Sequence, residues 1–110
     1  MAQRLFVYGT LGPGRPNEHV LSAIGGRWEE ASVNGHLEPQ GWGAELGYPG
    51  IVLDDAGDEV EGYLYSSDKL DDHWDELDDF EGEEYKRVLI TVRTKDRMAV
   101  EAYIYILRES

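Results

Sequence analysis

The sequence predicts an α+β domain built on a curved sheet or a small barrel. Several short apolar runs are bounded by glycine, proline or asparagine, which is typical of strands. Residues 69–80 carry apolar side chains at helical spacing, and this predicts one longer helix. A polar turn at residues 94–97 separates two further apolar runs and indicates an antiparallel hairpin. The expected order of elements is β-α-β-β-β-α-β-β.

The composition is that of a folded domain. With 110 residues, the chain is predicted to form a single domain, residues 1–110, long enough to bury a core. Hydrophobic residues make up 41% of the chain, and two Phe, three Trp and seven Tyr add aromatic bulk, which argues against disorder. Because there is no cysteine, disulfides, thiol nucleophiles and thiolate metal ligands are excluded, and packing must stabilise the fold.

The charge balance is strongly acidic. Ten Lys and Arg against 23 Asp and Glu give a net charge of −13, which repels phosphate backbones, so we expect no nucleic-acid partner. A well-solvated surface explains this acidity as well as any function does. No apolar run approaches the roughly 20 residues of a membrane span, and the N-terminus does not read as a signal peptide. We therefore expect no membrane association and a cytoplasmic location.

The first elements are a strand and a short helix. Residues 5–8 form a continuous apolar run that ends at Gly9, as expected of a buried strand that enters a turn. Asn17 is placed to cap a short helix, which Gly25 and Gly26 would end. One face of this helix is apolar and carries Val20, Leu21 and Ile24.

Residues 27–50 give a divided signal. The pair Asn34-Gly35 on its own predicts a tight hairpin turn. Residues 33–38 are equally compatible with one strand that has a glycine inside it. A loop is predicted from Gly41 to Gly50.

The second half has a sharper pattern. A turn is predicted at residues 54–58, and residues 66–68 offer caps for the longer helix. The inward face of that helix carries Leu70, Trp74 and Leu77. Four further strands are predicted, at residues 50–53, 60–65, 87–93 and 100–107.

Glu81 lies where the apolar face of the longer helix would continue. It follows Leu70 by eleven residues, which places it on the same side as Trp74 and Leu77, and Gly82 can terminate the helix after it. Burial and the negative end of the helix both disfavour the carboxylate, so they should raise its pKa from about 4.3 toward the range of general acid–base catalysis. The alternative is that the helix frays first and Glu81 is one of 23 surface acids, and Asp78 competes for the same face.

The glycine-rich segment after the first strand is the second candidate site. A strand that stops at Gly9 leaves backbone N–H groups free to hold a carboxylate or carbonyl oxygen. A phosphate-binding loop does not fit, because Arg15-Pro16 stands where that pattern needs Lys and then Ser or Thr. An ordinary connection between strand and helix is the alternative.

Other side chains give no comparable pattern. The three histidines lack metal-ligand spacing, and the aspartates at positions 71, 72, 75, 78 and 79 are typical of a solvated helix face, so no metal site is predicted. The serines have no nucleophile-elbow context. Four tyrosines alternate within strands and are expected to line the core or a pocket, namely Tyr63, Tyr65, Tyr103 and Tyr105.

Together these segments resemble the γ-glutamylcyclotransferase-like superfamily, in particular its small branch with the AIG2-like proteins and γ-glutamylamine cyclotransferase. The resemblance runs from about Leu5 to the final strand. It is carried by four motifs and two single residues: Phe6-Val7-Tyr8-Gly9-Thr10-Leu11, Tyr48-Pro49-Gly50-Ile51-Val52, Val60-Glu61-Gly62-Tyr63-Leu64-Tyr65, Leu77-Asp78-Asp79-Phe80-Glu81-Gly82, Tyr85 and Arg87. It implies a small mixed β-barrel flanked by short helices, and a single strand through Asn34-Gly35.

The resemblance also implies a function and a site. The expected enzyme cyclises the γ-glutamyl group of a γ-glutamyl amine or peptide to 5-oxoproline without a cofactor. Glu81 would be the acid–base residue. The substrate would be held by Tyr8, Gly9, Thr10, Leu11 and Tyr85. Two alternatives stay open: a binding module for a small carboxylated metabolite, and an interaction protein that works through its acidic surface.

Overall fold

The computed structural model describes residues 3–8, 18–38, 50–82 and 85–107. Their strands are β1 (Gln3–Val7), β2 (Arg27–Glu38), β3 (Gly50–Leu53), β4 (Asp58–Ser67), β5 (Tyr85–Thr94) and β6 (Ala99–Leu107). The helices are α1 (Glu18–Ser22), the 3-10 turn η2 (Leu70–Asp72) and α2 (Trp74–Glu81).

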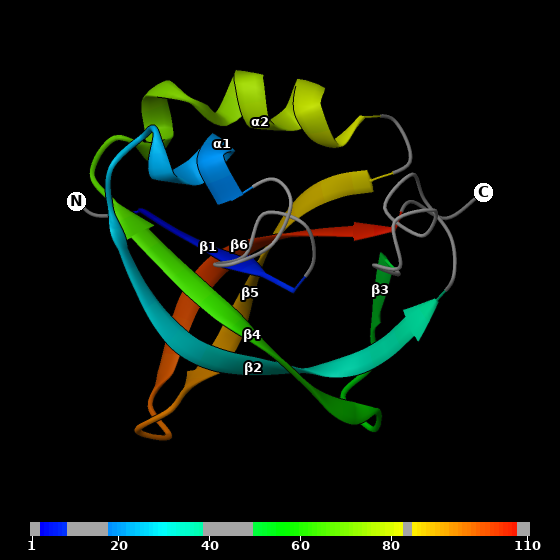
Figure 1. Ribbon diagram of the computed structural model, residues 1–110. Coiled ribbons are helices and arrows are strands. Elements are labelled where there is room, and N and C mark those ends of the chain that lie inside the picture. Colours follow the sequence, from blue (N-terminus) through cyan, green and yellow to red (C-terminus); the bar gives the residue numbers. More distant parts are fainter. Residues whose placement is uncertain (1–2, 9–17, 39–49, 83–84, 108–110) are drawn as a thin grey trace.

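The strands form one sheet that closes on itself (Figure 1). Its order is β3-β2-β4-β1-β6-β5, and a further pairing of β2 with β5 joins the ends into a five-stranded barrel, with β3 as an extra strand beside β2. Strands β1 and β6 run parallel and every other pair is antiparallel, so the barrel is mixed. The expected small mixed barrel with short helices is confirmed.

Alternation along the strands creates two cores. Side chains such as Phe6, Leu64 and Ile104 fill the interior of the barrel. Their neighbours Leu5, Tyr65 and Tyr105 point outward into a second buried cluster, which lies beneath the helices. The outward cluster is apolar because the helices cover this side of the barrel.

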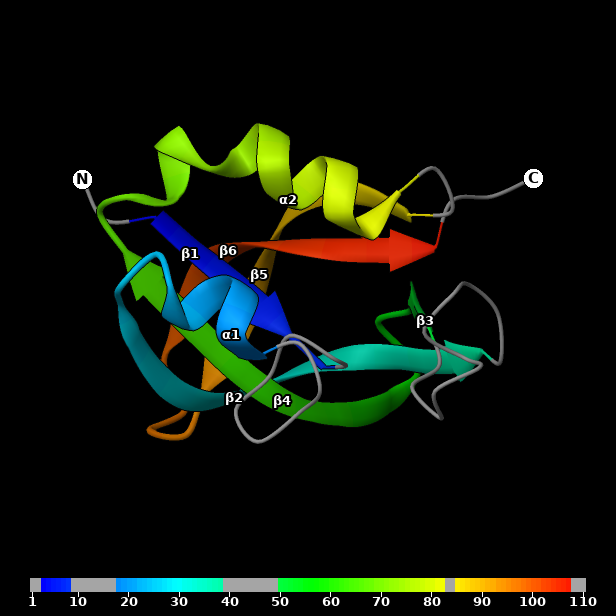
Figure 2. The ribbon, with the colours of Figure 1, turned by 45° about the horizontal axis from the view of Figure 1, so that its top comes forward.

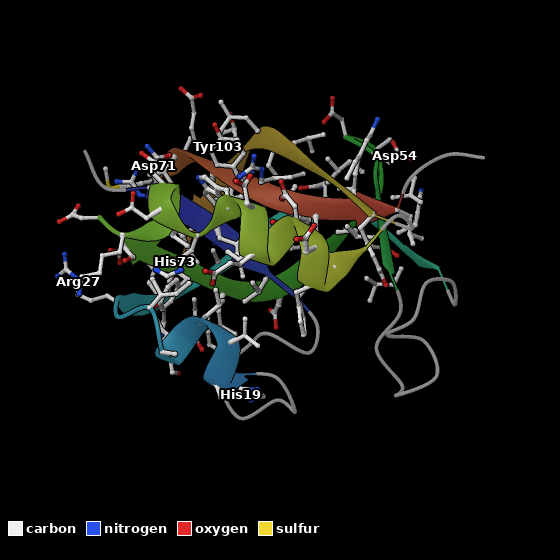
Figure 3. All side chains as sticks on the ribbon, turned by 90° about the horizontal axis from the view of Figure 1, so that it is seen from above. His19, Arg27, Asp54, Asp71, His73 and Tyr103 are labelled. Atoms are coloured by element: carbon white, nitrogen blue, oxygen red, sulfur yellow. The ribbon has the colours of Figure 1, made fainter. Side chains whose placement is uncertain are left out.

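Helices α1 and α2 lie on the same side of the barrel (Figures 1 and 2). Helix α1 ends at Ser22 and is shorter than the apolar pattern suggests, but Leu21 and Ile24 are both buried in the outer cluster. Seen from above, α2 crosses over β1 and β6 (Figure 3).

The longer helix is interrupted, and the prediction of one continuous helix over residues 69–80 was wrong. His73 has φ −122° and ψ 2°, outside helical values, and separates η2 from α2. The indole N–H of Trp74 donates to Asp71 Oδ1 at 3.1 Å across the break. Leu70, Trp74 and Leu77 are nevertheless all buried, so the predicted inward face is confirmed.

The segment through Asn34-Gly35 is one strand, and the hairpin alternative was wrong. Strand β2 pairs with β4 up to Gly35 and with β3 from Gly35 onward, so this glycine lies where the partner changes. A side chain there would collide with the Val52 carbonyl oxygen and the Leu53 Cα. The Asn34 side chain is also used, because its amide donates to the Gly57 carbonyl at 3.1 Å.

The remaining predicted elements are present with adjusted ends. Strand β3 has the expected bounds, and β4, β5 and β6 are each longer than the apolar runs that indicated them. Strands β5 and β6 form the predicted hairpin. The predicted cap Asn17 and most of the predicted loop at 41–50 lie outside the described residues. Within the described ranges, no helix has the length and apolar character needed to cross a membrane.

Gly62 is a position where the barrel has no room for a side chain. A Cβ there would overlap the Val7 carbonyl oxygen and the ring of Phe6 in the barrel interior. We predict that Gly62→Ala lowers the free energy of unfolding by about 1–3 kcal/mol, because neither the strand nor a buried ring can easily move. Urea unfolding measures this.

The matched control is Glu61→Ala on the same strand, where the side chain is exposed. It should change the free energy of unfolding by no more than about 0.5 kcal/mol. Equal effects of the two substitutions would contradict the packing described for Gly62.

Candidate active site

Glu81 is the last residue of α2 and stands at one end of the barrel. Gly82 follows with φ 85°, a value that favours glycine, and its N–H donates to the Asp78 carbonyl at 3.0 Å. The helix therefore continues to Glu81 and does not fray before it. Glu81 lies on the side of the helix that buries Leu77 and is itself partly buried.

Burial changes the acidity of Glu81. Loss of solvation raises its pKa from the ordinary 4.5 to about 7. The expected direction of this pKa shift is confirmed, and its cause is removal from water. A carboxyl with this pKa is populated in both protonation states near neutral pH, as proton transfer in both directions requires.

Tyr8 directly follows β1 and reaches the same end of the barrel. Its hydroxyl donates to the Tyr105 carbonyl at 2.7 Å and accepts from the Ile51 N–H at 3.1 Å. Burial raises the pKa of Tyr8 far above its ordinary value, and the nearby negative charge of Glu81 raises it further. Tyr8 and Glu81 are thus close enough to interact electrostatically, and the phenol stays neutral.

Tyr85 completes this group at the start of β5. Its side chain is 7% exposed, and its N–H donates to the Gly82 carbonyl at 3.3 Å. Charge on Tyr85 would also raise the pKa of Tyr8, so these two phenols lie near each other. The structure therefore brings together Glu81 of α2, Tyr8 directly after β1 and Tyr85 of β5.

The other predicted binding residues directly follow Tyr8 in the chain. Gly9, Thr10 and Leu11 lie outside the described residues. Their contact with substrate stays a prediction. Tyr8, their described neighbour, has its hydroxyl engaged by two main-chain groups. A substrate would therefore contact the backbone or the ring of Tyr8.

Two groups near Tyr8 were not predicted as parts of the site: Tyr105, for which only a place in the core or a pocket was expected, and the N–H of Ile51. Tyr105 donates from its hydroxyl to Asp78 Oδ1 at 2.6 Å, while its carbonyl accepts from Tyr8. The alternation of tyrosines in the last strand was the available signal for Tyr105. A backbone N–H carries no residue-type signal, so the role of Ile51 depends on how β3 docks.

An open groove of about 510 Å³ passes this end of α2. Its lining comes from the last turn of α2, the start of β5 and the end of β6, and consists of Asp78, Asp79, Gly82, Tyr85, Lys86, Arg87 and Tyr105. Acidic and basic side chains are both present in it. The last turn of α2 therefore borders open space on the side of Asp78 and Gly82.

The three histidines lie in different parts of the fold. His19 is on α1, whereas His73 lies between η2 and α2 (Figure 3). His36 pairs with Asp54 at 2.8 Å on the surface. Among residues 3–8, 18–38, 50–82 and 85–107, no three or more His, Asp or Glu side chains are grouped so as to hold a metal ion.

Comparison with known proteins shows a family match and several similar structures. The family model described as gamma-glutamyl cyclotransferase, AIG2-like, matches residues 5–110. The crystal structure of YkqA from Bacillus subtilis is 30% identical with a TM-score of 0.74, covering 100% of this chain and 37% of YkqA. No curated protein matches the chain.

Two further structures are similar. A solution structure of an Arabidopsis thaliana protein is 25% identical with a TM-score of 0.75, over 97% of this chain and 62% of that protein. The crystal structure of an AIG2-like protein from Mus musculus is 23% identical with a TM-score of 0.72, over 96% of this chain and 76% of that one. At this identity the mouse structure supports the fold alone.

The raised pKa of Glu81 predicts how stability depends on pH. The carboxyl titrates near 4.5 when solvated and at about 7 in the fold, so folding favours the protonated form. This stabilising contribution is complete below about pH 4.5 and is lost as the pH rises through about 7. Glu81→Gln cannot ionise, and its stability relative to the parent should increase between those two pH values.

Thermal unfolding of both proteins at a series of pH values measures this difference. Asp75→Asn is the matched control, because Asp75 lies on the same helix with its side chain exposed. A difference between Glu81→Gln and the parent that stays constant with pH would mean that Glu81 is solvated.

Proposed function

This chain belongs to the gamma-glutamyl cyclotransferase, AIG2-like family, and we propose that it is an enzyme. The reaction is conversion of the γ-glutamyl group of a γ-glutamyl amine or peptide to 5-oxoproline, with release of the amine. The observation that carries this proposal is the placement of Glu81, a partly buried carboxyl with a pKa of about 7 beside Tyr8 and Tyr85. An acid–base step needs a carboxyl of this kind, and Glu81 lies near Tyr8, the residue that follows the first strand.

The chemistry requires proton transfer more than a strong nucleophile. A γ-glutamyl amide contains its own nucleophile, the α-amine, which is protonated at neutral pH. The Glu81 carboxylate accepts a proton from this ammonium, and the amine then attacks the γ-carbonyl carbon. A ring C–N bond forms and the original amide C–N bond breaks. The ring nitrogen loses its second proton as the bond forms. The departing amine takes up the two protons that the ring nitrogen has lost, with Glu81 as the relay, and leaves as an ammonium.

Holding the substrate is the other task of the site. Ring closure is intramolecular, so an enzyme that fixes one conformer removes much of the entropic barrier. We assign this to the backbone of Tyr8, Gly9, Thr10 and Leu11, whose N–H groups would hold the γ-glutamyl group and the developing oxyanion. Tyr85 would line the pocket. Because Tyr8 stays neutral, it does not repel an anionic substrate group.

The preferred substrates are γ-glutamyl amines such as γ-glutamyl-lysine. The net charge of −13 disfavours multiply anionic substrates such as glutathione. No step of this reaction requires a metal or an organic cofactor, because the only events are one acyl transfer and the movement of protons from the ring nitrogen to the departing amine.

We predict that the parent protein releases 5-oxoproline from at least one member of a panel of γ-glutamyl amines and peptides. Glu81→Gln should abolish turnover, because the amide cannot accept the ammonium proton, while the fold and substrate binding are retained. Mass detection of 5-oxoproline and calorimetric binding measure the two properties. Glu76→Gln, on the exposed side of the same helix, should keep parental activity.

Activity of Glu81→Gln near the parental level would remove Glu81 from the mechanism. Binding of a panel member without any 5-oxoproline would instead identify the protein as a binding module for a small carboxylated metabolite.

The pKa of Glu81 also predicts a pH profile. As base, Glu81 must begin as carboxylate, and this form increases as pH rises through about 7. On the acid side, kcat/KM should rise about tenfold per pH unit and level off above about pH 7. Initial rates at low substrate concentration measure the profile. An acid limb centred near 4.5 would mean that the working carboxyl is solvated.

A further inference from the structure

Asp78 lies one turn before Glu81 on α2 and is tied to the barrel by two polar contacts. Its Oδ1 accepts from the Tyr105 hydroxyl at 2.6 Å and lies 3.5 Å from Arg87 Nε. Tyr105 is on β6 and Arg87 is on β5. One carboxylate oxygen therefore connects the last turn of α2 to both strands of the hairpin.

Arg87 is held in place by aromatic rings. Its guanidinium carbon lies 4.4 Å from the ring centre of Trp74 and 5.2 Å from that of Tyr103. These two rings meet edge-on with their centres 5.0 Å apart, and Figure 3 shows Tyr103 beside the beginning of the helix. Among the described residues, the buried Nη1 of Arg87 has no hydrogen-bond partner. The ring faces and Asp78 are what offset its charge.

Tyr105 connects this arrangement to the candidate site. Its hydroxyl holds Asp78, and its main-chain carbonyl accepts the hydroxyl of Tyr8. Burial raises the pKa of Tyr105, and the hydrogen bond to Asp78 raises it further, so the phenol remains a donor. The charge of Glu81 acts on both Tyr8 and Tyr105. A single residue thus links the helix that carries Glu81 to the strand that leads into the predicted binding loop.

The apolar packing of α2 weakens before the helix ends. Leu77 is fully buried, whereas Phe80 in the last turn is only partly buried. The final turn of a helix lacks half of its internal hydrogen bonds and frays readily. The contacts of Asp78 occur in this turn, where apolar packing gives way to polar contacts.

We propose that Asp78, Arg87 and Tyr105 are positioning residues that fix the last turn of α2. In this way they hold the Glu81 carboxyl in its partly buried position beside Tyr8. They do not touch the reacting atoms. This role rests on the proposed function for its catalytic consequence, but the position of the Glu81 carboxyl is a property of the protein without substrate. When the ties to Asp78 are lost, water reaches Glu81 and its distance from the substrate amine becomes variable.

The test uses Tyr105→Phe, which deletes one hydroxyl and keeps the ring. Tyr63→Phe is the matched control, because Tyr63 is a partly buried strand tyrosine on β4 whose ring contacts Trp28. Carbon-13 NMR of glutamate-labelled protein follows the carboxyl titration without substrate, and the Glu81 signal is assigned by its loss in Glu81→Gln. Steady-state kinetics on the best γ-glutamyl substrate gives kcat and KM.

In Tyr105→Phe, the pKa of Glu81 should fall from about 7 toward 4.5. The value of kcat should fall about tenfold or more, with KM changed less than about twofold. Tyr63→Phe should move neither quantity. Arg87→Gln, which removes the charged partner of Asp78, serves as the second variant if Tyr105→Phe does not fold. Loss of the positive charge alone would raise the pKa of Glu81, so a fall in that pKa reports lost positioning.

A merely structural role would lower the unfolding temperature and leave the pKa of Glu81 and kcat unchanged, and that result would overturn the proposal. A parental pKa near 4.5 would overturn it as well. If the parental protein turns over no substrate, the proposed function fails, while the NMR titration still decides whether these residues hold Glu81.

Discussion

Burial of one face of α2 against the outside of the barrel is the constraint on which the site depends. Trp74 and Leu77 of α2, together with Leu70 of η2, are buried in one cluster with outward-facing side chains of β1, β4, β5 and β6. Burying apolar surface of this size stabilises the docked helix by several kcal/mol in total, at about 1.5–3 kcal/mol for each large side chain. The same face continues to Glu81, so the packing that holds the helix also removes a carboxyl from solvent.

Barrel closure supplies the second half of the site. The ends of β1 and β6 and the beginnings of β3 and β5 meet near the end of α2, and the Tyr8 hydroxyl joins three of these strands by binding the main chain of Tyr105 and of Ile51. At both contacts the partner of the Tyr8 hydroxyl is a main-chain atom. These contacts fix the main chain of Tyr105 and Ile51 beside Tyr8 without any ligand. Under the proposed function, this lowers the reorganisation needed for reaction.

Docking of the helix face and burial of the Glu81 carboxyl oppose each other energetically, a conflict that is common at functional sites. A carboxyl with a pKa of about 7 is less favourable in the fold, when ionised, than one in water. The polar ties around Asp78 and the ring contacts of Arg87 stabilise the turn in which this carboxyl lies. The acidic surface adds repulsion between like charges and increases the need for such local ties.

Much of this molecule follows from local pattern in the sequence. Short apolar runs bounded by turn residues predicted the strands, helical spacing placed Glu81 on the face of Leu70, Trp74 and Leu77, and the ordered motifs indicated the family. These features depend on residues close in sequence, so a single chain shows them. Tertiary structure decided what depends on distant partners: β2 runs through Gly35 because β3 and β4 both pair with it, and the helix breaks at His73 while its inward face stays docked. The contacts of Tyr8 with Ile51 and of Asp78 with Tyr105 span 43 and 27 residues. Only closure of the barrel brings such pairs together, and no periodicity along the chain encodes them.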